Sequence, residues 1–395
     1  MTSPEAPILF EERPTQSGHR IGVATLNAEK SLNALSLEMI ELLAEQLPRW
    51  QADPGIVAVW LQGSGEKAFC AGGNIVRLYE SIKESGRQRN PYAERFFTLE
   101  YQVDHLIHTF NKPLICWGHG IVMGGGLGLM SGARFRIVTE KSRIAMPEVA
   151  IGLYPDVGGS WFLNKMPGRV GLFLGLSGVS INAGDALFVG LADRFLPNEL
   201  RATTLDEMVS LPWQGSGHAD EALVDDWLRS KEETHREAIP LSPVRQHLDQ
   251  INKLMDHGHA TAAYSALATL ETDDPWLQQA VKGVRKGSPA SAVLIWEQLH
   301  RARHWSLAQT FREELVVSVN CCSHGEFAEG VRALLIEKDG NPAWQFASVE
   351  AVPAAWISEH FVSPWIAQTH PLQGLGESSG SSSPSIPLLR GERDF

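Results

Sequence analysis

The chain has 395 residues, which is enough for one large domain or two with a substantial buried core. Its apolar and charged fractions, 43% and 20%, are ordinary for a globular protein, and no run of residues reaches the apolar length that spans a bilayer. The formal net charge of −12 argues against a general nucleic-acid binder, which would carry a basic stripe. An anionic ligand held by local basic residues or by helix N-termini remains possible.

The cysteines and the first residues indicate a reducing compartment. There are four cysteines, two of them adjacent at Cys321 and Cys322, and no CxxC spacing, so a disulfide framework is not expected. The segment MTSPEAPILFEERP carries early acids and no apolar stretch, unlike a signal or transit peptide. We therefore expect a cytoplasmic protein without a membrane segment.

The first half of the chain alternates between strand and helix patterns. We interpret residues 1–20 as an N-terminal lead; strands are predicted at 21–27, 56–63 and 113–117 and from Phe135. Ser36 can cap a helix with apolar residues at helical spacing, and a second helix is predicted over 91–109. This alternation predicts an α/β sheet with crossover helices.

The second half is dominated by helix-period segments, which predict helices over, for example, 223–237, 243–256 and 290–302. We assign residues 21–197 to the α/β core and 198–370 to a mostly helical C-terminal region, either a second domain or an extension of the first. Residues 371–395 are rich in Gly, Ser and Pro and are predicted to be a disordered tail.

Two carboxylates stand out in the stretch 145–160, AMPEVAIGLYPDVGGS. Glu148 and Asp156 lie eight positions apart, each directly after a proline, among apolar and turn residues. Two acids held on rigid turns in an apolar setting suit a site in which one pKa is raised and the other stays low. Turn chemistry alone also explains Pro, Asp and Gly, so the stretch by itself leaves both interpretations open.

Two glycine turns could each present a backbone N–H group to a ligand oxygen. Gly124–Gly126 opens a predicted helix after a strand, and Gly72–Gly73 follows another strand. A pair of converging amides is what an oxyanion hole requires. Close helix–sheet packing for the triplet and an ordinary turn for the pair are the alternatives.

Other chemistry finds little support. No GxGxxG or GK[ST] register fits the glycine triplet, and no serine has the flanking glycines of a hydrolase nucleophile elbow. His300 and His304 are four apart, and His257 and His259 flank a glycine, but neither pair has the acid or cysteine partners of a metal site. No metal site is predicted.

Taken together, these pieces resemble the crotonase (enoyl-CoA hydratase/isomerase) superfamily, and within it the 3-hydroxyisobutyryl-CoA hydrolase branch. The resemblance extends from about Gly22 to Phe361. The segments that carry it are NALSLEMI, KAFCAGGNI, GHGIVMGGGLGLM, AMPEVAIGLYPDVGGSWFL and CSHGEFAEGVRALLIEKDGNPAW. The last segment lies outside the usual crotonase core and is similar to the hydrolase branch.

The resemblance implies a core of repeated ββα turns and an acyl-CoA substrate whose thioester oxygen is held by the amides of Gly73 and Gly125. It implies Glu148 and Asp156 as catalytic acids, with Glu100 also near the substrate. Hydratases carry another glutamate where this chain has Gly128, so their two-glutamate machinery is incomplete here. Where the family usually has Asp, this chain has Asn74, which we expect to alter a loop or CoA contact.

The expected function is therefore hydrolysis of a short 3-hydroxyacyl-CoA, most simply 3-hydroxyisobutyryl-CoA of valine breakdown. Glu100, Gly125, Glu148 and Asp156 are the expected substrate-binding residues. No cofactor is expected beyond the CoA of the substrate, no nucleic-acid or membrane partner is expected, and a homo-oligomer is possible. Enoyl-CoA isomerisation or hydration and a non-catalytic crotonase-like binding subunit are the alternatives.

Overall fold

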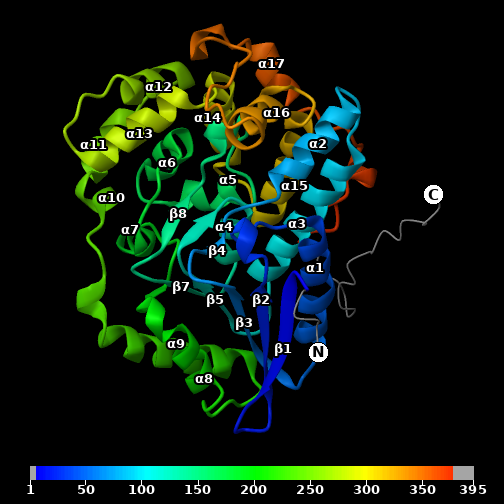
Figure 1. Ribbon diagram of the computed structural model, residues 1–395, viewed down its shortest axis with the longest axis vertical. Coiled ribbons are helices and arrows are strands. Elements are labelled where there is room, and N and C mark those ends of the chain that lie inside the picture. The colour runs from blue at the N-terminus through cyan, green and yellow to red at the C-terminus, as the bar shows by residue number, and fades with distance from the viewer. Residues whose placement is uncertain (1–5, 377–395) are drawn as a thin grey trace.

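The computed structural model describes residues 6–376, and a six-stranded sheet forms its centre (Figure 1). The strand order is β1-β2-β3-β5-β7-β9, and all neighbours are parallel except the antiparallel pair β1 and β2. Its strands are β1 Ile8–Pro14, β2 Arg20–Leu26, β3 Ile56–Gly63, β5 Leu114–Gly118, β7 Phe135–Val138 and β9 Arg194–Phe195.

A second, smaller sheet is interleaved with the first along the chain. It is parallel, in the order β4-β6-β8, with β4 at Ala68–Cys70, β6 at Ile121–Met123 and β8 at Arg143–Ala145. Each long strand β3, β5 and β7 is followed by one short strand and then by helix. This repeat of two strands and a helix confirms the predicted ββα architecture.

Helices surround the two sheets, and turns and loops connect them (Figure 1). The α-helices are α1 Leu37–Ala52, α2 Ile75–Ser85, α3 Pro91–His108, α4 Gly125–Ser131, α5 Gly159–Phe162, α6 Val170–Ser177, α7 Ala183–Phe188, α8 Arg201–Met208, α9 Gly217–Glu233, α10 Pro243–Gln246, α11 Leu248–Met255, α12 Ala260–Ala268, α13 Pro275–Lys286, α14 Pro289–Ala302, α15 Leu307–Cys321, α16 Glu326–Val331 and α17 Ala354–Glu359. The 3-10 helices are η1 Glu29–Ser31, η2 Glu148–Ile151, η3 Leu163–Lys165, η4 Asn198–Leu200, η5 Arg236–Ala238, η7 Val349–Ala351 and η8 Ala367–Thr369, and a π-helix, η6, spans Arg332–Ile336.

Local sequence explains the elements that were predicted best. Ser36 caps α1, accepting a hydrogen bond from the Met39 amide at 3.1 Å, as its position before the apolar pattern predicts. Strands β3 and β5 are almost wholly buried because the large sheet is covered on both faces. Trp60 and Trp117 stack on one face against α8 and α9, while Leu61 and Cys116 on neighbouring positions join the main core on the other.

The helical region shares one core with the sheets. A single cluster of buried apolar residues runs from Ile8 in β1 to Leu372 near the end of the described chain and includes Phe311 and Leu315 of α15. In Figure 1 the helices α11 to α14, α16 and α17 lie at the end of the molecule opposite to the turns of β1 and β2. The helical C-terminal region is therefore confirmed, whereas the domain boundaries stay a prediction.

Two interpretations differ from the structure. Residues 8–14 belong to the predicted lead but form β1, and its seven residues were missed because an exposed edge strand shows no apolar alternation. The predicted helix over 243–256 is divided at His247 into α10 and α11. The predicted disordered tail spans residues 371–395, and residues 377–395 of this tail lie outside the described chain.

Two further sequence expectations can be compared with the described chain. All four cysteines are buried free thiols. Between residues 6 and 376, no helix is both long enough and apolar enough to cross a membrane.

Candidate active site

The three short strands deliver the glycine turns and the first acid to one edge. Gly73 follows β4, Gly125 follows β6, and Glu148 follows β8. Because the strands are parallel neighbours, their carboxyl ends lie together. The two glycine turns and Glu148 thus meet although 75 residues separate the first from the last.

The backbones of the two glycine turns are in contact, and both adopt conformations that favour glycine. Gly72 has φ +109° and Gly124 has φ +48°, and a Cβ on Gly72 would lie 3.5 Å from the Met123 carbonyl oxygen. Gly125 is the first residue of α4, where an amide has no acceptor within the helix. Among the hydrogen bonds of residues 6–376, the Gly73 amide donates to none, whereas the next amide, that of Asn74, donates to Leu35.

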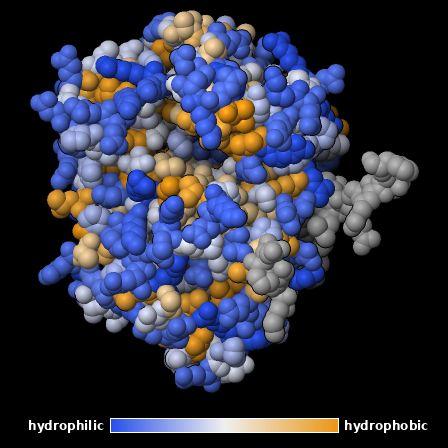
Figure 2. Space-filling view, viewed as in Figure 1, coloured by the Kyte–Doolittle hydropathy of each residue, from blue (hydrophilic) through white to orange (hydrophobic). Residues whose placement is uncertain are grey.

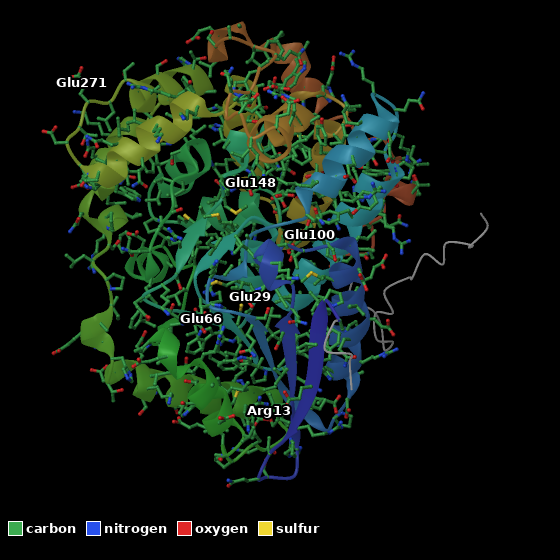
Figure 3. All side chains as sticks on the ribbon, viewed as in Figure 1. Arg13, Glu29, Glu66, Glu100, Glu148 and Glu271 are labelled. Carbon is green, nitrogen blue, oxygen red and sulfur yellow. The ribbon has the colours of Figure 1, made fainter. Side chains whose placement is uncertain are left out.

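Both glutamates predicted for the site lie against the glycine triplet. Glu148 opens η2, and its Oε1 would be 3.1 Å from a Cβ placed on Gly124. Glu100 comes from α3, and a Cβ on Gly125 would overlap its Oε1. Figure 3 labels both glutamates in the middle of the molecule, away from the labelled Arg13 and Glu271 near its margins. Glycine at 125 is therefore required for the close approach of Glu100.

Asp156 stands on a strained turn between η2 and α5. The next residue, Val157, has φ +53°, a conformation that β-branched residues rarely adopt and that costs free energy of order 1–3 kcal/mol. The buried carboxylate of Glu314 in α15 accepts hydrogen bonds from the amides of Gly158 at 2.7 Å and Ser160 at 2.9 Å. The helical region therefore holds the strained turn in place.

All five predicted site residues line one cavity of about 220 Å³. Its wall is completed by apolar side chains of α2, α3, α16 and the π-helix η6, namely Leu78, Phe96, Phe97, Phe327, Leu334 and Leu335. Figure 2 shows hydrophobic surface near α16. Of the chain around the cavity, Val76 of α2 and Leu334 of η6 are exposed. An apolar cavity with a few converging polar groups is the usual form of a small-molecule site.

The acids of the site are buried, and their pKa values are raised. Burial, followed by the charge of Asp156, raises the pKa of Glu148 well above its ordinary value, and burial with the same neighbour does so for Glu100. Burial also raises the pKa of Asp156, to about 6, against the lowering effect of a 2.6 Å hydrogen bond from the Tyr101 hydroxyl. Within residues 6–376 no Lys or Arg forms an ion pair with these three acids.

Sequence reasoning missed the partners that surround the predicted acids. Asp104, one helical turn after Glu100, is fully buried, and neither of its carboxyl oxygens has a hydrogen-bond partner in the described chain. Tyr101, Tyr154 and Ser318 form a hydroxyl network beside Asp156. The sequence did carry a signal for Asp104, because it lies four positions after Glu100 on the apolar face of the same helix.

Other predicted features have structural roles or remain without a ligand. Asn74 caps α2, accepting a hydrogen bond from the Arg77 amide at 3.4 Å, so the departure from Asp lies at the start of a helix that lines the cavity. His300 stacks on Trp296, and His259 caps α12. In the described part of the chain no three His, Cys, Asp or Glu side chains are placed to hold a metal ion.

The comparisons with known sequences agree on one family. The profile of the enoyl-CoA hydratase/isomerase family matches residues 21–361. The 3-hydroxyisobutyryl-CoA hydrolase, mitochondrial, of Danio rerio is 35% identical over 346 residues, covering 87% of each chain. The protein of the same name from Homo sapiens is 34% identical over 343 residues, covering 87% of this chain and 86% of its own.

Solved structures give the same fold. An enoyl-CoA hydratase from Rhodobacter sphaeroides 2.4.1 superposes with a TM-score of 0.77 at 30% identity, covering 91% of this chain and 98% of that one. A carnitinyl-CoA dehydratase from Mycobacterium thermoresistibile superposes with a TM-score of 0.76 at 30% identity, covering 91% and 97%.

Proposed function

The chain belongs to the enoyl-CoA hydratase/isomerase family, and from this premise we propose that it hydrolyses the thioester of a short 3-hydroxyacyl-CoA, with 3-hydroxyisobutyryl-CoA as the first substrate to test. Relatives that carry the name of this hydrolase match over most of their length. In a cell, this reaction would belong to valine breakdown.

The proposal rests on the residues that line one cavity. Glu148 and Asp156 line it together with the two glycine turns, while position 128, where hydratases have a glutamate, is glycine. The cavity therefore offers groups for attack at a carbonyl carbon and lacks one of the two acids for adding water across a double bond.

The amides of Gly73 and Gly125 would donate hydrogen bonds to the thioester oxygen. Negative charge develops on that oxygen as the carbonyl carbon is attacked, and two fixed donors stabilise it more than the neutral carbonyl. The apolar wall from α2 and α16 supports this role, because electrostatic stabilisation is stronger where water is excluded.

Glu148 would perform the attack in one of two ways. As a nucleophile, its carboxylate oxygen bonds to the carbonyl carbon, CoA leaves as thiolate, and water then cleaves the anhydride. As a general base, it takes a proton from water while the water oxygen attacks. Burial raises the pKa of Glu148, which makes its ionised form the stronger base.

Asp156 and Glu100 would orient the substrate. Glu100 lines the cavity from α3 and Asp156 from the turn after η2. There they would hydrogen-bond the hydroxyl group on the third carbon of the acyl chain. The raised pKa of Glu100 allows it to carry a proton at neutral pH and so to donate as well as accept a hydrogen bond, whereas Asp156, with a pKa of about 6, is mostly ionised there and accepts. These steps use only the chain and its substrate, so we propose no cofactor.

A thiol-release panel tests the function. Purified protein is incubated with 3-hydroxyisobutyryl-CoA, its unbranched 3-hydroxy analogues, acetyl-CoA and crotonyl-CoA, and free CoA is measured with a thiol reagent. Release from the 3-hydroxyacyl thioesters is the expected result. A change of enoyl absorbance without thiol indicates an isomerase or hydratase, and no reaction with tight acyl-CoA binding indicates a binding subunit.

A cytoplasmic location and a homo-oligomer stay predictions. Fractionation of the source cells tests the location, and light scattering of the full chain tests the oligomer.

A further inference from the structure

A chain of buried hydroxyl groups leads from Asp156 into the helical region. The Tyr101 hydroxyl lies 2.6 Å from Oδ2 of Asp156 and 2.7 Å from Oγ of Ser318. Ser318 in turn lies 2.9 Å from the Tyr154 hydroxyl, which donates to the Glu314 carbonyl oxygen at 2.8 Å. Tyr101, Tyr154 and Ser318 are fully buried, so solvent cannot replace these contacts.

The geometry accommodates an ionised Asp156. In that state the Tyr101 hydroxyl donates to Oδ2, Ser318 donates to the Tyr154 oxygen, and Tyr154 donates to the Glu314 carbonyl. Each buried hydroxyl hydrogen then has an acceptor, as burial requires.

The same atoms also accommodate a protonated Asp156. Its Oδ2–H donates to the Tyr101 oxygen, and the Tyr101 hydroxyl turns to donate to Ser318. Ser318 and Tyr154 keep the bonds that they made before. Only one O–H bond rotates between the two states.

We propose that Ser318, acting through Tyr101, is a positioning residue that lets Asp156 take up and release a proton inside the core. The inference rests on the proposed thioester hydrolysis. In that reaction water loses a proton as its oxygen bonds to the acyl carbon, and the sulfur of CoA gains a proton as the C–S bond breaks. Asp156 can give a proton to that sulfur and regain one from the water, directly or after Glu148 has taken it. Ser318 allows this because it accepts the Tyr101 hydrogen whenever Asp156 is protonated.

The arrangement predicts opposite effects for the two partners. Without the Tyr101 hydroxyl, ionised Asp156 loses its donor, so the pKa of Asp156 rises. Without the Ser318 hydroxyl, protonated Asp156 leaves the Tyr101 hydrogen with no acceptor, so the pKa of Asp156 falls. A side chain that merely fills space would not produce this reversal of sign.

Other ionisable groups around Asp156 remain in place in both variants. They come from α3, from η2 and the following turn, and from α15, and they are Glu100, Asp104, Glu148, Tyr154, Glu314, Cys321 and Cys322. Their contributions are therefore common to the wild type and both variants.

The experiment is an infrared titration of the full-length protein without substrate. The carboxyl band that disappears in Asp156→Asn identifies Asp156, and its midpoint is followed with pH in Tyr101→Phe and Ser318→Ala. We expect the midpoint to rise by about one pH unit in the first and to fall by about one unit in the second, since one net hydrogen bond is at stake. Tyr92→Phe, on the same helix but outside the network, serves as the control and should not shift it.

An unchanged or raised midpoint in folded Ser318→Ala overturns the proposal, and so does an unchanged or lowered midpoint in Tyr101→Phe. If alanine prevents folding, Ser318→Cys replaces the hydroxyl with a weaker acceptor of similar shape and should also lower the midpoint. Because no substrate is present, this result is independent of the thiol-release panel. Failure of the panel alone would reject the hydrolase function and leave the measured coupling in place.

Discussion

The carboxyl group of Asp104 occupies the space that a side chain on Gly128 would need. A Cβ built on Gly128 lies 2.8 Å from Oδ2 of Asp104 and 2.7 Å from Cβ of Val157. The position at which hydratases carry a glutamate is therefore closed by a buried acid from α3 and by the strained turn beside Asp156. A glutamate at position 128 is therefore excluded by the packing of two other residues, Asp104 and Val157.

Gly128→Ala should destabilise the protein by about 1–3 kcal/mol, because both neighbours must move. Asp104→Ala should reduce this loss when the two substitutions are combined, since one of the two overlaps disappears. Urea unfolding of the two single variants and the double variant measures the coupling. Strictly additive effects would mean that Asp104 is not what closes the position.

Glu148→Gln should lower the rate of thiol release by at least about 10²-fold, because the amide can neither attack nor accept a proton. Acyl-CoA binding should remain, since glutamine has nearly the same shape. Steady-state kinetics and calorimetry separate the two effects, with the exposed Glu237→Gln as the matched control. Near-normal turnover would falsify the role of Glu148.

The role of the Gly125 amide can be tested by comparing an alanine with a proline substitution. Alanine and proline both place a Cβ against Glu100, but only proline removes the amide N–H, and proline is tolerated at the first position of a helix. We expect kcat for Gly125→Pro to be about 10²–10³-fold below that of Gly125→Ala. Equal rates in the two folded variants would show that the amide does not hold the oxyanion.

Glu314 should make the protein less stable as the pH rises. Burial raises the pKa of Glu314 from 4.5 to about 8, so between these values the unfolded chain loses a proton that the folded chain keeps. Stability therefore falls with rising pH through this window. Glu314→Gln removes this contribution and also loses one acceptor for the Gly158 and Ser160 amides.

The Glu314→Gln variant should be clearly less stable than the wild type near pH 5, and the difference should shrink by pH 8.5. Urea midpoints across this range provide the measurement, and Glu237→Gln should follow the wild type. Parallel curves for wild type and Glu314→Gln would place the pH dependence elsewhere.

Local sequence was sufficient for elements whose cause is local. The apolar run of β3 marks a strand buried on both faces, and Ser36 with its apolar spacing marks α1. By contrast, β4, β6 and β8 have three residues each, too few for any periodicity. The α2 pattern was missed although Asn74 precedes it as a cap.

The predicted site residues share one cavity, but the contacts that hold them could not be predicted. Tyr101 and Ser318 are 217 positions apart, and only the packing of α15 against α3 brings their hydroxyls together. The buried Glu314 gives no local signal, because an acid in a helix is normally exposed. Its role becomes clear only when the two amides that it binds are seen.

Glu314 stabilises the turn at Val157 by accepting hydrogen bonds from the Gly158 and Ser160 amides, and this has a consequence for biosynthesis. A ribosome releases the chain from its N-terminus, so Asp156 emerges long before α15 does. Until then the turn that keeps Val157 in a left-handed conformation lacks the two hydrogen bonds from Gly158 and Ser160 to Glu314. Truncated chains that end before residue 314 should accordingly be recognised by proteases at this loop.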